Sequence, residues 1–355
     1  MMKVKLLALV ISTFMGIGCI HAAEIFNKDG NKIDLNGKVD VSRIFSSNDS
    51  KHGDDSYARL GFKGETQISD SLTGYGMFEY QFRLDNPEGE GVQNGNRARL
   101  GFAGLKFGDY GSLDYGRNYG LIYDALSYTD VLPKFGGDAA YSDVFLTSRS
   151  GGVATWRTSN LFGMVEGLQW AAQYQGKNER EGSRSVVRSN GDGYATSVGY
   201  NSDAGISLVA AWASVDRTDA QNLAPRGEGK HAELWSTAIK YDMNQFYLAA
   251  MYGQTRNATP IDGGFANKAQ NFEAVAQYLF LNGLQPSLAY VTSRAKDVEG
   301  VGDADIYKYA NIGAKYFMNV NMVAYIEHRI NLLKEDNPLG LPTDDITGIG
   351  LIYQF

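Results

Sequence analysis

Basic side chains occur at polar positions of segments in which apolar and polar residues alternate. One long segment of the chain, which shows no such alternation, is rich in acids. Charges of opposite sign that face each other across a constriction make a transverse field, which can sort small ions and orient dipolar solutes without binding them. Each base could instead be solvated or paired with Glu65 or Glu79. The bases are Lys38, Arg59, Arg97, Arg99 and Arg149, and the acids between residues 117 and 150 are Asp124, Asp130, Asp138 and Asp143.

Residue types that carry covalent catalysis are sparse in this sequence. Beyond residue 22 the histidines are His52, His231 and His328, and none has a positioned partner typical of a Ser-His-acid triad. Asp303 and Asp305 could bind a divalent ion, but a solvated loop tip is the better explanation for them. We therefore expect no enzyme activity, no metal site and no cofactor.

Length and composition exclude several classes of protein. The 355 residues include 33 Lys+Arg and 40 Asp+Glu, a net charge of −7 that repels nucleic-acid phosphates. Aromatic residues make up 12% of the chain, too many for a disordered protein. Beyond the N-terminus no run of 18 apolar residues occurs, which excludes a helical membrane protein.

The N-terminus resembles an export signal. Lys3 and Lys5 precede an apolar stretch from Leu6 to Ile20, and small residues follow at Ala22 and Ala23. This pattern predicts a signal peptide over residues 1–22, too short to span a membrane, followed by one domain over residues 23–355. Cleavage there would also remove the one cysteine, so no disulfide is expected.

Almost every segment of the remaining chain alternates apolar and polar residues, the period of β-strands. Leu168, Trp170, Ala172 and Tyr174, for example, alternate with glutamines. The connections between these segments fall into two strictly alternating classes. Seven short ones cover residues 69–73, 107–112, 161–167, 201–205, 242–245, 281–283 and 318–321. Eight long ones cover residues 46–56, 85–96, 117–150, 175–193, 214–232, 254–270, 293–307 and 330–345.

Strict alternation places all short turns at one end of the sheet and all long loops at the other. Transmembrane β-barrels have this asymmetry, and strands of 9–11 residues are long enough to cross a bilayer when tilted. We therefore predict an all-β, 16-stranded antiparallel barrel with apolar and aromatic residues facing lipid. A barrel of this size encloses a water-filled lumen, which the charged and Gln-rich faces would line.

The connection 117–150 differs from the other loops in length and composition. It is the longest, and its Leu121, Ile122, Tyr123 and Leu126 are able to pack against protein. Loops of more than about 15 residues are usually functional or disordered, and the apolar content argues against disorder. We expect this loop to fold into the lumen.

Several motifs make the sequence similar to the general diffusion porins of enterobacterial outer membranes. They include AEIFNKDGNKIDLNGKVD near the N-terminus, YARLGFKGETQISDSLTGYG, LDYGRNYGLIYDALSYTDVLPKFGGD and the final LIYQF. The resemblance covers essentially the whole mature chain. It implies a sixteen-stranded barrel, a homotrimer in the outer membrane, and a third outer loop that folds inward to form an eyelet.

The resemblance also assigns residues to the eyelet. It implies that Lys38, Arg59, Arg99 and Arg149 are eyelet bases, with Arg97 beside them, and that Asp130 is an eyelet acid. The family's PEFGGD is PKFGGD here, so that Lys134 stands where an eyelet glutamate is usual. The hypothesis that follows is a pore less selective for cations than is usual in the family. Glu88 matches an acid of the second outer loop, which reaches a neighbouring subunit.

The expected partners follow from the same resemblance: a homotrimer, outer-membrane lipid and lipopolysaccharide, and small hydrophilic solutes and ions, but no nucleic acid. Two other functions remain open. A substrate-specific channel would be expected to line its path with aromatic residues for stacking on sugars. An adhesin or structural anchor would use the exposed loops and show no conductance.

Overall fold

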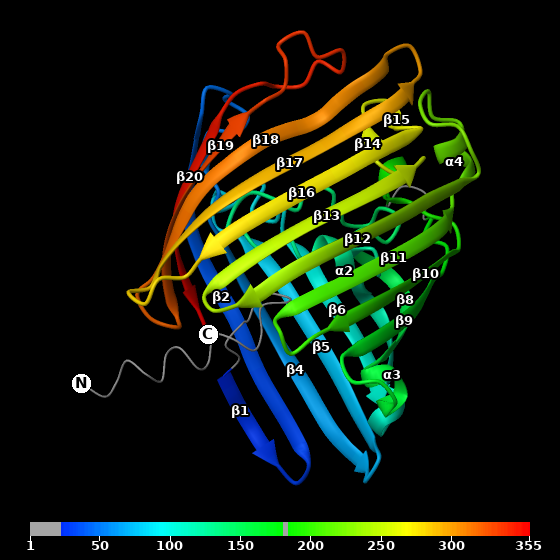
Figure 1. The fold of residues 1–355 in the computed structure, drawn as a ribbon, viewed down its shortest axis with the longest axis vertical. Coiled ribbons are helices and arrows are strands. Elements are labelled where there is room, and N and C mark those ends of the chain that lie inside the picture. Colours follow the sequence, from blue (N-terminus) through cyan, green and yellow to red (C-terminus); the bar gives the residue numbers. More distant parts are fainter. Residues whose placement is uncertain (1–22, 180–183) are drawn as a thin grey trace.

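The computed structural model describes residues 23–179 and 184–355, so that the predicted signal peptide lies outside the described residues. Sixteen long antiparallel strands close into one barrel (Figure 1). They are β2 (Asn31–Ser46), β4 (Tyr57–Ser69), β5 (Leu72–Arg83), β6 (Arg97–Lys106), β7 (Ser112–Tyr119), β8 (Arg149–Thr158), β9 (Leu168–Gln175), β10 (Gly193–Asn201), β11 (Ile206–Asp216), β12 (His231–Met243), β13 (Phe246–Arg256), β16 (Lys268–Tyr278), β17 (Leu284–Val298), β18 (Gly302–Phe317), β19 (Met322–Asn331) and β20 (Ile346–Gln354).

The remaining elements are short and lie at the ends of the barrel or in its loops. No helix of the described residues is both long and apolar enough to cross a membrane. The short strands are β1 (Ala23–Lys28), β3 (Gly53–Asp54), β14 (Pro260–Ile261) and β15 (Gly264–Phe265), and the helices are η1 (Gly108–Tyr110), α2 (Tyr123–Leu126), α3 (Asn160–Gly163), η2 (Val186–Arg188) and α4 (Asp219–Asn222).

The barrel closes where its first and last long strands pair. β20 pairs with β2 from Lys38–Gln354 to Ser46–Ile346, and β1 pairs with the preceding part of β2. Closure gives each of the sixteen long strands a partner on both sides, and an open edge in hydrocarbon would leave backbone groups unpaired at several kcal/mol each. The predicted fold is confirmed, although the hairpin formed by β1 was not expected.

The alternation of residue types matches the alternation of burial along each strand. In β11, Leu208 and Trp212 are about half exposed, whereas Val209 and Ala211 between them are buried. Successive side chains of a strand point to opposite faces. The exposed apolar side chains therefore form the outer surface of the barrel, and the buried set faces inward.

One predicted loop is wrong. Residues 293–307 were expected to form a long connection, but β17 and β18 extend through most of this range and are joined by a turn of residues 299–301. The pairing is irregular after Ser293 and again after Ala295. These irregularities and the many charged residues hide the strand period in the sequence.

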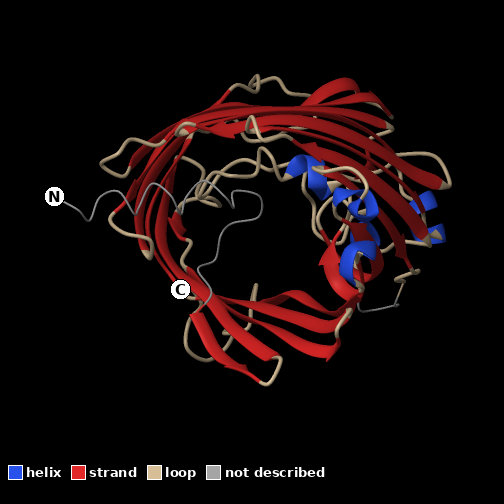
Figure 2. Cartoon of the chain, turned by 60° about the horizontal axis from the view of Figure 1, so that its bottom comes forward, coloured by secondary structure: helices blue, strands red, loops and turns tan. Residues whose placement is uncertain are grey.

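The connection between β7 and β8, called loop 3 below (residues 120–148), folds into the barrel as predicted. Figure 2, a view towards one end of the barrel, shows loops and a short helix inside the ring of strands. Leu121, Ile122 and Leu126 are almost fully buried against the inner faces of β8 to β13. Burying each of these side chains contributes about 1.5–3 kcal/mol to holding the loop in place.

The inner face carries more aromatic residues than expected from the sequence. Tyr57, Tyr247, Tyr309 and Tyr325 are buried. The Tyr247 hydroxyl donates to the loop 3 carbonyl of Tyr128 (2.7 Å), and the Tyr309 hydroxyl accepts from the Gly136 amide (3.0 Å). These inward tyrosines join the wall to loop 3 by hydrogen bonds, and a period of two cannot tell which aromatic residues face inward.

Candidate functional site: a charged constriction beside loop 3

The five predicted bases come from four strands. We call them together the basic wall: Lys38 on β2, Arg59 on β4, Arg97 and Arg99 on β6, and Arg149 at the start of β8. Lys38 and Arg59 are directly opposite each other across the β2–β4 pair. Like charges at such cross-strand positions repel, so neighbouring groups must compensate for them.

Tyr57 lies at the centre of this compensation. The Lys38 ammonium lies 5.0 Å and the Arg59 guanidinium 4.8 Å from the centre of its ring, both within the range of cation–π attraction. The Lys38 Nζ atom is also 3.9 Å from the Asp40 carboxylate, and Arg59 donates to the Gln81 side chain at 2.9 Å. Asp40 was not predicted, and it partly neutralises Lys38.

A β-bulge shapes the β6 part of the wall. Glu79 pairs with Leu100 and Tyr80 with Ala98, so that Arg99 is an extra residue in the ladder. Its guanidinium forms a buried ion pair with Glu79. Arg97, two residues earlier, is exposed and forms no ion pair or side-chain hydrogen bond with any residue the structure describes. Of the two arginines, Arg97 therefore retains its charge for mobile ions.

Arg149, at the start of β8, and Asp130, within loop 3, are the remaining predicted charges of the constriction. Arg149 donates to the Ser142 hydroxyl (2.8 Å) and lies over the Tyr119 ring. The Asp130 carboxylate accepts from the Tyr123 hydroxyl (2.7 Å). Burial raises the pKa of Asp130 above its ordinary value, although this hydroxyl and nearby guanidinium groups act in the opposite direction.

Gly137 fixes the position of this carboxylate. Its φ of +66° is in the left-handed region, and a Cβ atom there would lie 2.5 Å from the Asp130 carboxyl carbon. Only glycine satisfies both conditions without strain. The local structure of loop 3 therefore requires the second glycine of its GGD sequence.

The other three acids of loop 3 do not face the basic wall as free charges. Asp124 accepts two bonds from Arg157, both 2.9 Å, and Asp143 accepts two from Arg117, at 2.7 and 2.9 Å. Asp138 is inside the loop, where burial raises its pKa. The expectation that the acids of the loop face the bases as a group is therefore wrong for Asp124 and Asp143, because arginines of β7 and β8 bind them.

Lys134 is bound rather than free. Its ammonium forms an ion pair with the Asp55 carboxylate and donates to the Ser42 hydroxyl (2.7 Å), and its side chain is 7% exposed. Asp55 also binds Arg83 (2.6 Å). Sequence reasoning missed Asp55 because it lies 79 positions from Lys134, and no local pattern pairs the two.

Glu88, the predicted subunit contact, lies exposed in the connection between β5 and β6. A single chain does not test this role. No group of three or more acidic, histidine or cysteine side chains in the described parts of the chain could hold a metal ion.

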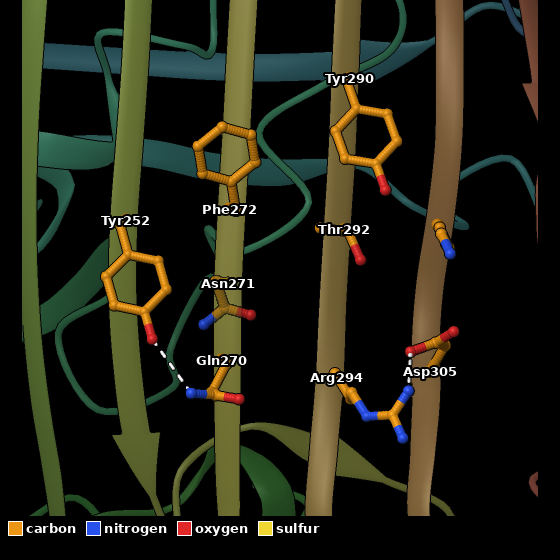
Figure 3. A pocket seen from close by; sticks show the side chains of 9 residues that line it. Tyr252, Gln270, Asn271, Phe272, Tyr290, Thr292, Arg294 and Asp305 are labelled. Carbon is orange, nitrogen blue, oxygen red and sulfur yellow. Dashed lines mark hydrogen bonds and ion pairs between the residues drawn. The ribbon is translucent and has the colours of Figure 1, made fainter.

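A separate pocket of about 310 Å³ lies in the barrel wall at β13, β16, β17 and β18. Figure 3 shows two interactions that line it, Gln270 with the Tyr252 hydroxyl (3.1 Å) and Arg294 with Asp305 (3.4 Å). Neither involves loop 3 or the basic wall, so this pocket is distinct from the constriction.

Comparison with known proteins gives a consistent result. The model of the Gram-negative porin family matches residues 28–355. The chain is 53% identical to outer membrane porin F of Escherichia coli and 52% identical to outer membrane porin PhoE of the same species, in both cases over the full length of both chains.

Solved structures agree with these relatives. A Salmonella typhi OmpF, solved in complex with daunomycin, has a TM-score of 0.88 at 45% identity and covers 94% of this chain and all of its own. An anion-selective porin from Comamonas acidovorans has a TM-score of 0.68 over 92% of this chain at 15% identity, which shows the shared fold alone.

Proposed function

This chain belongs to the Gram-negative porin family, and from that premise we propose that it is a trimeric diffusion pore whose eyelet is less selective for cations than is usual in the family. The pore is passive and water-filled, and it admits ions and small hydrophilic solutes. The observation that carries the ion preference is the balance of charge at the constriction. Five bases stand on the basic wall. Of the four acids of loop 3, Asp124 and Asp143 are bound by arginines and Asp138 is buried inside the loop, so that Asp130 is the acid we assign to the constriction.

Compensation within the basic wall limits the size of this preference. Glu79 binds Arg99 and Asp40 lies beside Lys38, whereas Arg59 has a neutral partner in Gln81. Arg97, Arg59 and Arg149 therefore supply most of the positive potential. The expected result is a weak preference, in keeping with a wide wet pore in which salt screens charges over about 10 Å at 0.1 M.

Planar-bilayer recording in a KCl gradient tests the proposal. Purified protein should insert as discrete conductance steps, with a reversal potential near zero or on the anion side. A strongly cation-selective reversal potential would contradict the proposed ion preference, and a silent bilayer would contradict the pore itself.

Liposome swelling separates a diffusion pore from a substrate-specific channel. Rates that fall smoothly with solute size support the diffusion pore. Saturable uptake of a single sugar would favour a specific channel, for which the inward tyrosines offer stacking surfaces. A protein that gives no conductance and no swelling would instead favour an adhesin or structural anchor.

Lys134 affects selectivity mainly because it stands where the family usually has a glutamate, so that the constriction lacks this acid. Lys134→Glu removes a positive charge and adds a negative one beside Asp55, so the reversal potential should move towards cations. An unchanged reversal potential would show that position 134 has no part in selectivity.

We assign the subunit contact to Glu88, which is exposed and free to reach a neighbouring barrel. Glu88→Ala should lower the temperature at which the trimer dissociates in a detergent gel. Glu90→Ala is the matched control, because Glu90 is an exposed acid of the same loop. Equal effects of the two substitutions would remove the special role of Glu88.

The apolar outer surface supports contact with outer-membrane lipid. For lipopolysaccharide, the supporting feature is the set of polar and basic residues around the wall pocket, among them Arg294 and Lys308. Arg294→Gln should weaken retention of lipopolysaccharide during purification, and unchanged retention would contradict this assignment. The proposal includes no catalytic step, and cleavage of lipid or peptide by the purified protein would overturn it.

A further inference from the structure

The side chain of Lys134 is held against the barrel wall by several groups. Its stem packs over Gly348 of β20, where a Cβ atom would lie 3.4 Å from it. Its ammonium binds the Asp55 carboxylate, the Ser42 hydroxyl (2.7 Å) and the Asp55 carbonyl (3.3 Å). The three hydrogens of the ammonium are thereby used, and the side chain has little freedom to enter the lumen.

The backbone at Lys134 is anchored by different groups. The amide of Lys134 donates to the Glu327 carboxylate at 2.7 Å and the amide of Phe135 at 3.3 Å, and the amide of Gly136 reaches the Tyr309 hydroxyl. These bonds hold this part of loop 3 on β18 and β19. The interaction with Asp55 therefore positions the side chain and is not needed to position the loop.

Asp55 is itself fixed and ionised. Arg83 binds it at 2.6 Å and also binds Asp85 at 2.7 Å, so that Lys134, Asp55, Arg83 and Asp85 form a row of alternating charges. Burial alone would raise the pKa of Asp55, but the hydrogen bonds from Lys134 and Arg83 hold it below the ordinary value. The carboxylate is therefore a permanent partner for the ammonium near neutral pH.

Without Asp55, the nearest charges would repel Lys134 from its present place. The Lys134 ammonium is 5.8 Å from the centre of the Tyr57 ring, around which Lys38 and Arg59 also gather. Because the charges of Lys38 and Arg59 repel it, the Lys134 ammonium needs a nearby anion to remain beside them. The lumen is the direction in which a released ammonium is best hydrated.

We propose that Asp55 is a specificity-determining residue of the pore, which acts by positioning Lys134. It holds the ammonium on the wall and cancels its charge, so that permeating ions meet the basic wall and Asp130 but not Lys134. This inference rests on the proposed diffusion function and deepens it. The unusual lysine of loop 3 thus alters selectivity chiefly by the absence of an acid.

Four proteins test the inference by their reversal potentials in a KCl gradient: wild type, Asp55→Asn, Lys134→Gln and the double variant. Asp55→Asn should raise the anion-to-cation permeability ratio about two- to threefold, the size expected when one added charge attracts anions and repels cations in water that contains screening salt. Lys134→Gln should lower the ratio, because Asp55 keeps a charge that Lys134 no longer cancels. The double variant should return close to wild type.

Coupling distinguishes positioning from a simple charge effect. If Asp55 acts through Lys134, Asp55→Asn shifts the reversal potential more when Lys134 is present than when Gln stands at that position. Equal shifts in the two backgrounds, or no shift at all, would overturn the inference. Asp303→Asn is the matched control, since this acid also binds a lysine, Lys296 (2.5 Å), but lies near the start of β18, away from loop 3. It should leave the reversal potential unchanged.

A second measurement does not depend on conduction. A carbodiimide joins an amine and a carboxylate in contact as an amide, with the lost water taken up to form the urea. Native protein should yield a peptide pair linked through Lys134 and Asp55, and denatured protein should not. Failure to form this link in the native protein would refute the inference even if the channel conducts. Formation of the link in a silent protein would leave the ion pair intact and contradict only the pore.

Discussion

Two halves of the same barrel carry inner faces of opposite chemistry. From β8 to β13 many inward residues are small and apolar, such as Ala171, Val209, Ala213 and Leu234, and they form one cluster with apolar residues of loop 3. β2, β4 and β6 carry inward charged residues such as Lys38, Arg59 and Arg97, and within the described part of the chain the apolar residues of loop 3 do not pack against these strands. The outer faces of both halves are apolar, so the difference lies in what each inner face must contact.

The residue types on the inner face of a strand therefore determine what lies against that face, either a packed loop or water. Alanine and valine leave room for loop side chains such as Leu121 and release water when the loop packs on them. Arginine and lysine would be too costly to bury without partners and therefore stay beside water. The covered half places the loop, and the basic half gives the remaining opening its charge.

A charge introduced into the covered half should have the largest effect. Ala213 is fully buried beneath loop 3, so Ala213→Asp would bury an unpaired carboxylate, at about 3–5 kcal/mol. We expect poor refolding or displacement of loop 3, measured by the heat-dependent shift in gel mobility and by protease cleavage within the loop. Thr73→Asp, opposite Lys106 on β6, is the control in the half that loop 3 leaves open and should fold normally. Equal tolerance would remove the contrast between the halves.

Acidification should have the next largest effect, on selectivity. The raised pKa of Asp130 means that this carboxyl takes up a proton at a higher pH than an ordinary aspartate, whereas Asp55, with its lowered pKa, stays ionised and keeps Lys134 bound. As the pH falls, the constriction loses an acid and keeps its bases. The reversal potential should therefore move towards anions before the ordinary aspartate range is reached.

Asp130→Asn tests whether this carboxyl carries the pH dependence. The variant should begin nearer the anion side and lose most of the pH dependence. The full wild-type pH dependence in the variant would assign the titration to other groups.

Moving the Asp130 carboxylate without removing its charge should have an intermediate effect on ion selectivity. Gly137→Ala places a methyl group against the Asp130 carboxyl and strains a left-handed residue, at about 1–2 kcal/mol. The permeability ratio should move towards anions by less than in Asp130→Asn. Gly340→Ala, also at a left-handed residue but with no atom nearby, controls for backbone strain alone. Identical behaviour of the two variants would mean that Gly137 does not position Asp130.

The smallest effect on stability is expected at Arg97. It has no ion pair among the described residues, so Arg97→Gln should change stability by about 0.5 kcal/mol or less. The reversal potential should nevertheless move measurably towards cations, because Arg97 supplies part of the positive potential. Arg99→Gln would leave buried Glu79 unpaired and should destabilise the barrel much more. Similar melting of the two variants would contradict the different roles assigned to them.

The barrel could be predicted from the sequence because its signal is local. Residues such as Leu208 and Trp212 face outward at every second position, and the long connection could be recognised by its length and its Leu121 and Ile122. The error at residues 293–307 arose where bulges and charges interrupt the period. A strand that pairs beyond the apolar band has no need of apolar residues, so periodicity alone does not reveal it.

The constriction could be predicted only in part. The resemblance identified the bases and Asp130. Which groups neutralise each of these charges depends on the register between paired strands and on the path of loop 3. Asp40 meets Lys38 within one strand, whereas Asp55 meets Lys134 across 79 positions and Glu79 meets Arg99 through a bulge. Such contacts depend on the closed barrel, which places distant strands side by side.

The most direct test of the central claim is the reversal potential of single wild-type channels in a KCl gradient at neutral pH. An opening lined by the basic wall and faced by Asp130 predicts stepwise currents that reverse near zero or on the anion side. Currents that reverse far on the cation side would contradict the assigned charge balance, and a membrane without steps would contradict the water-filled lumen.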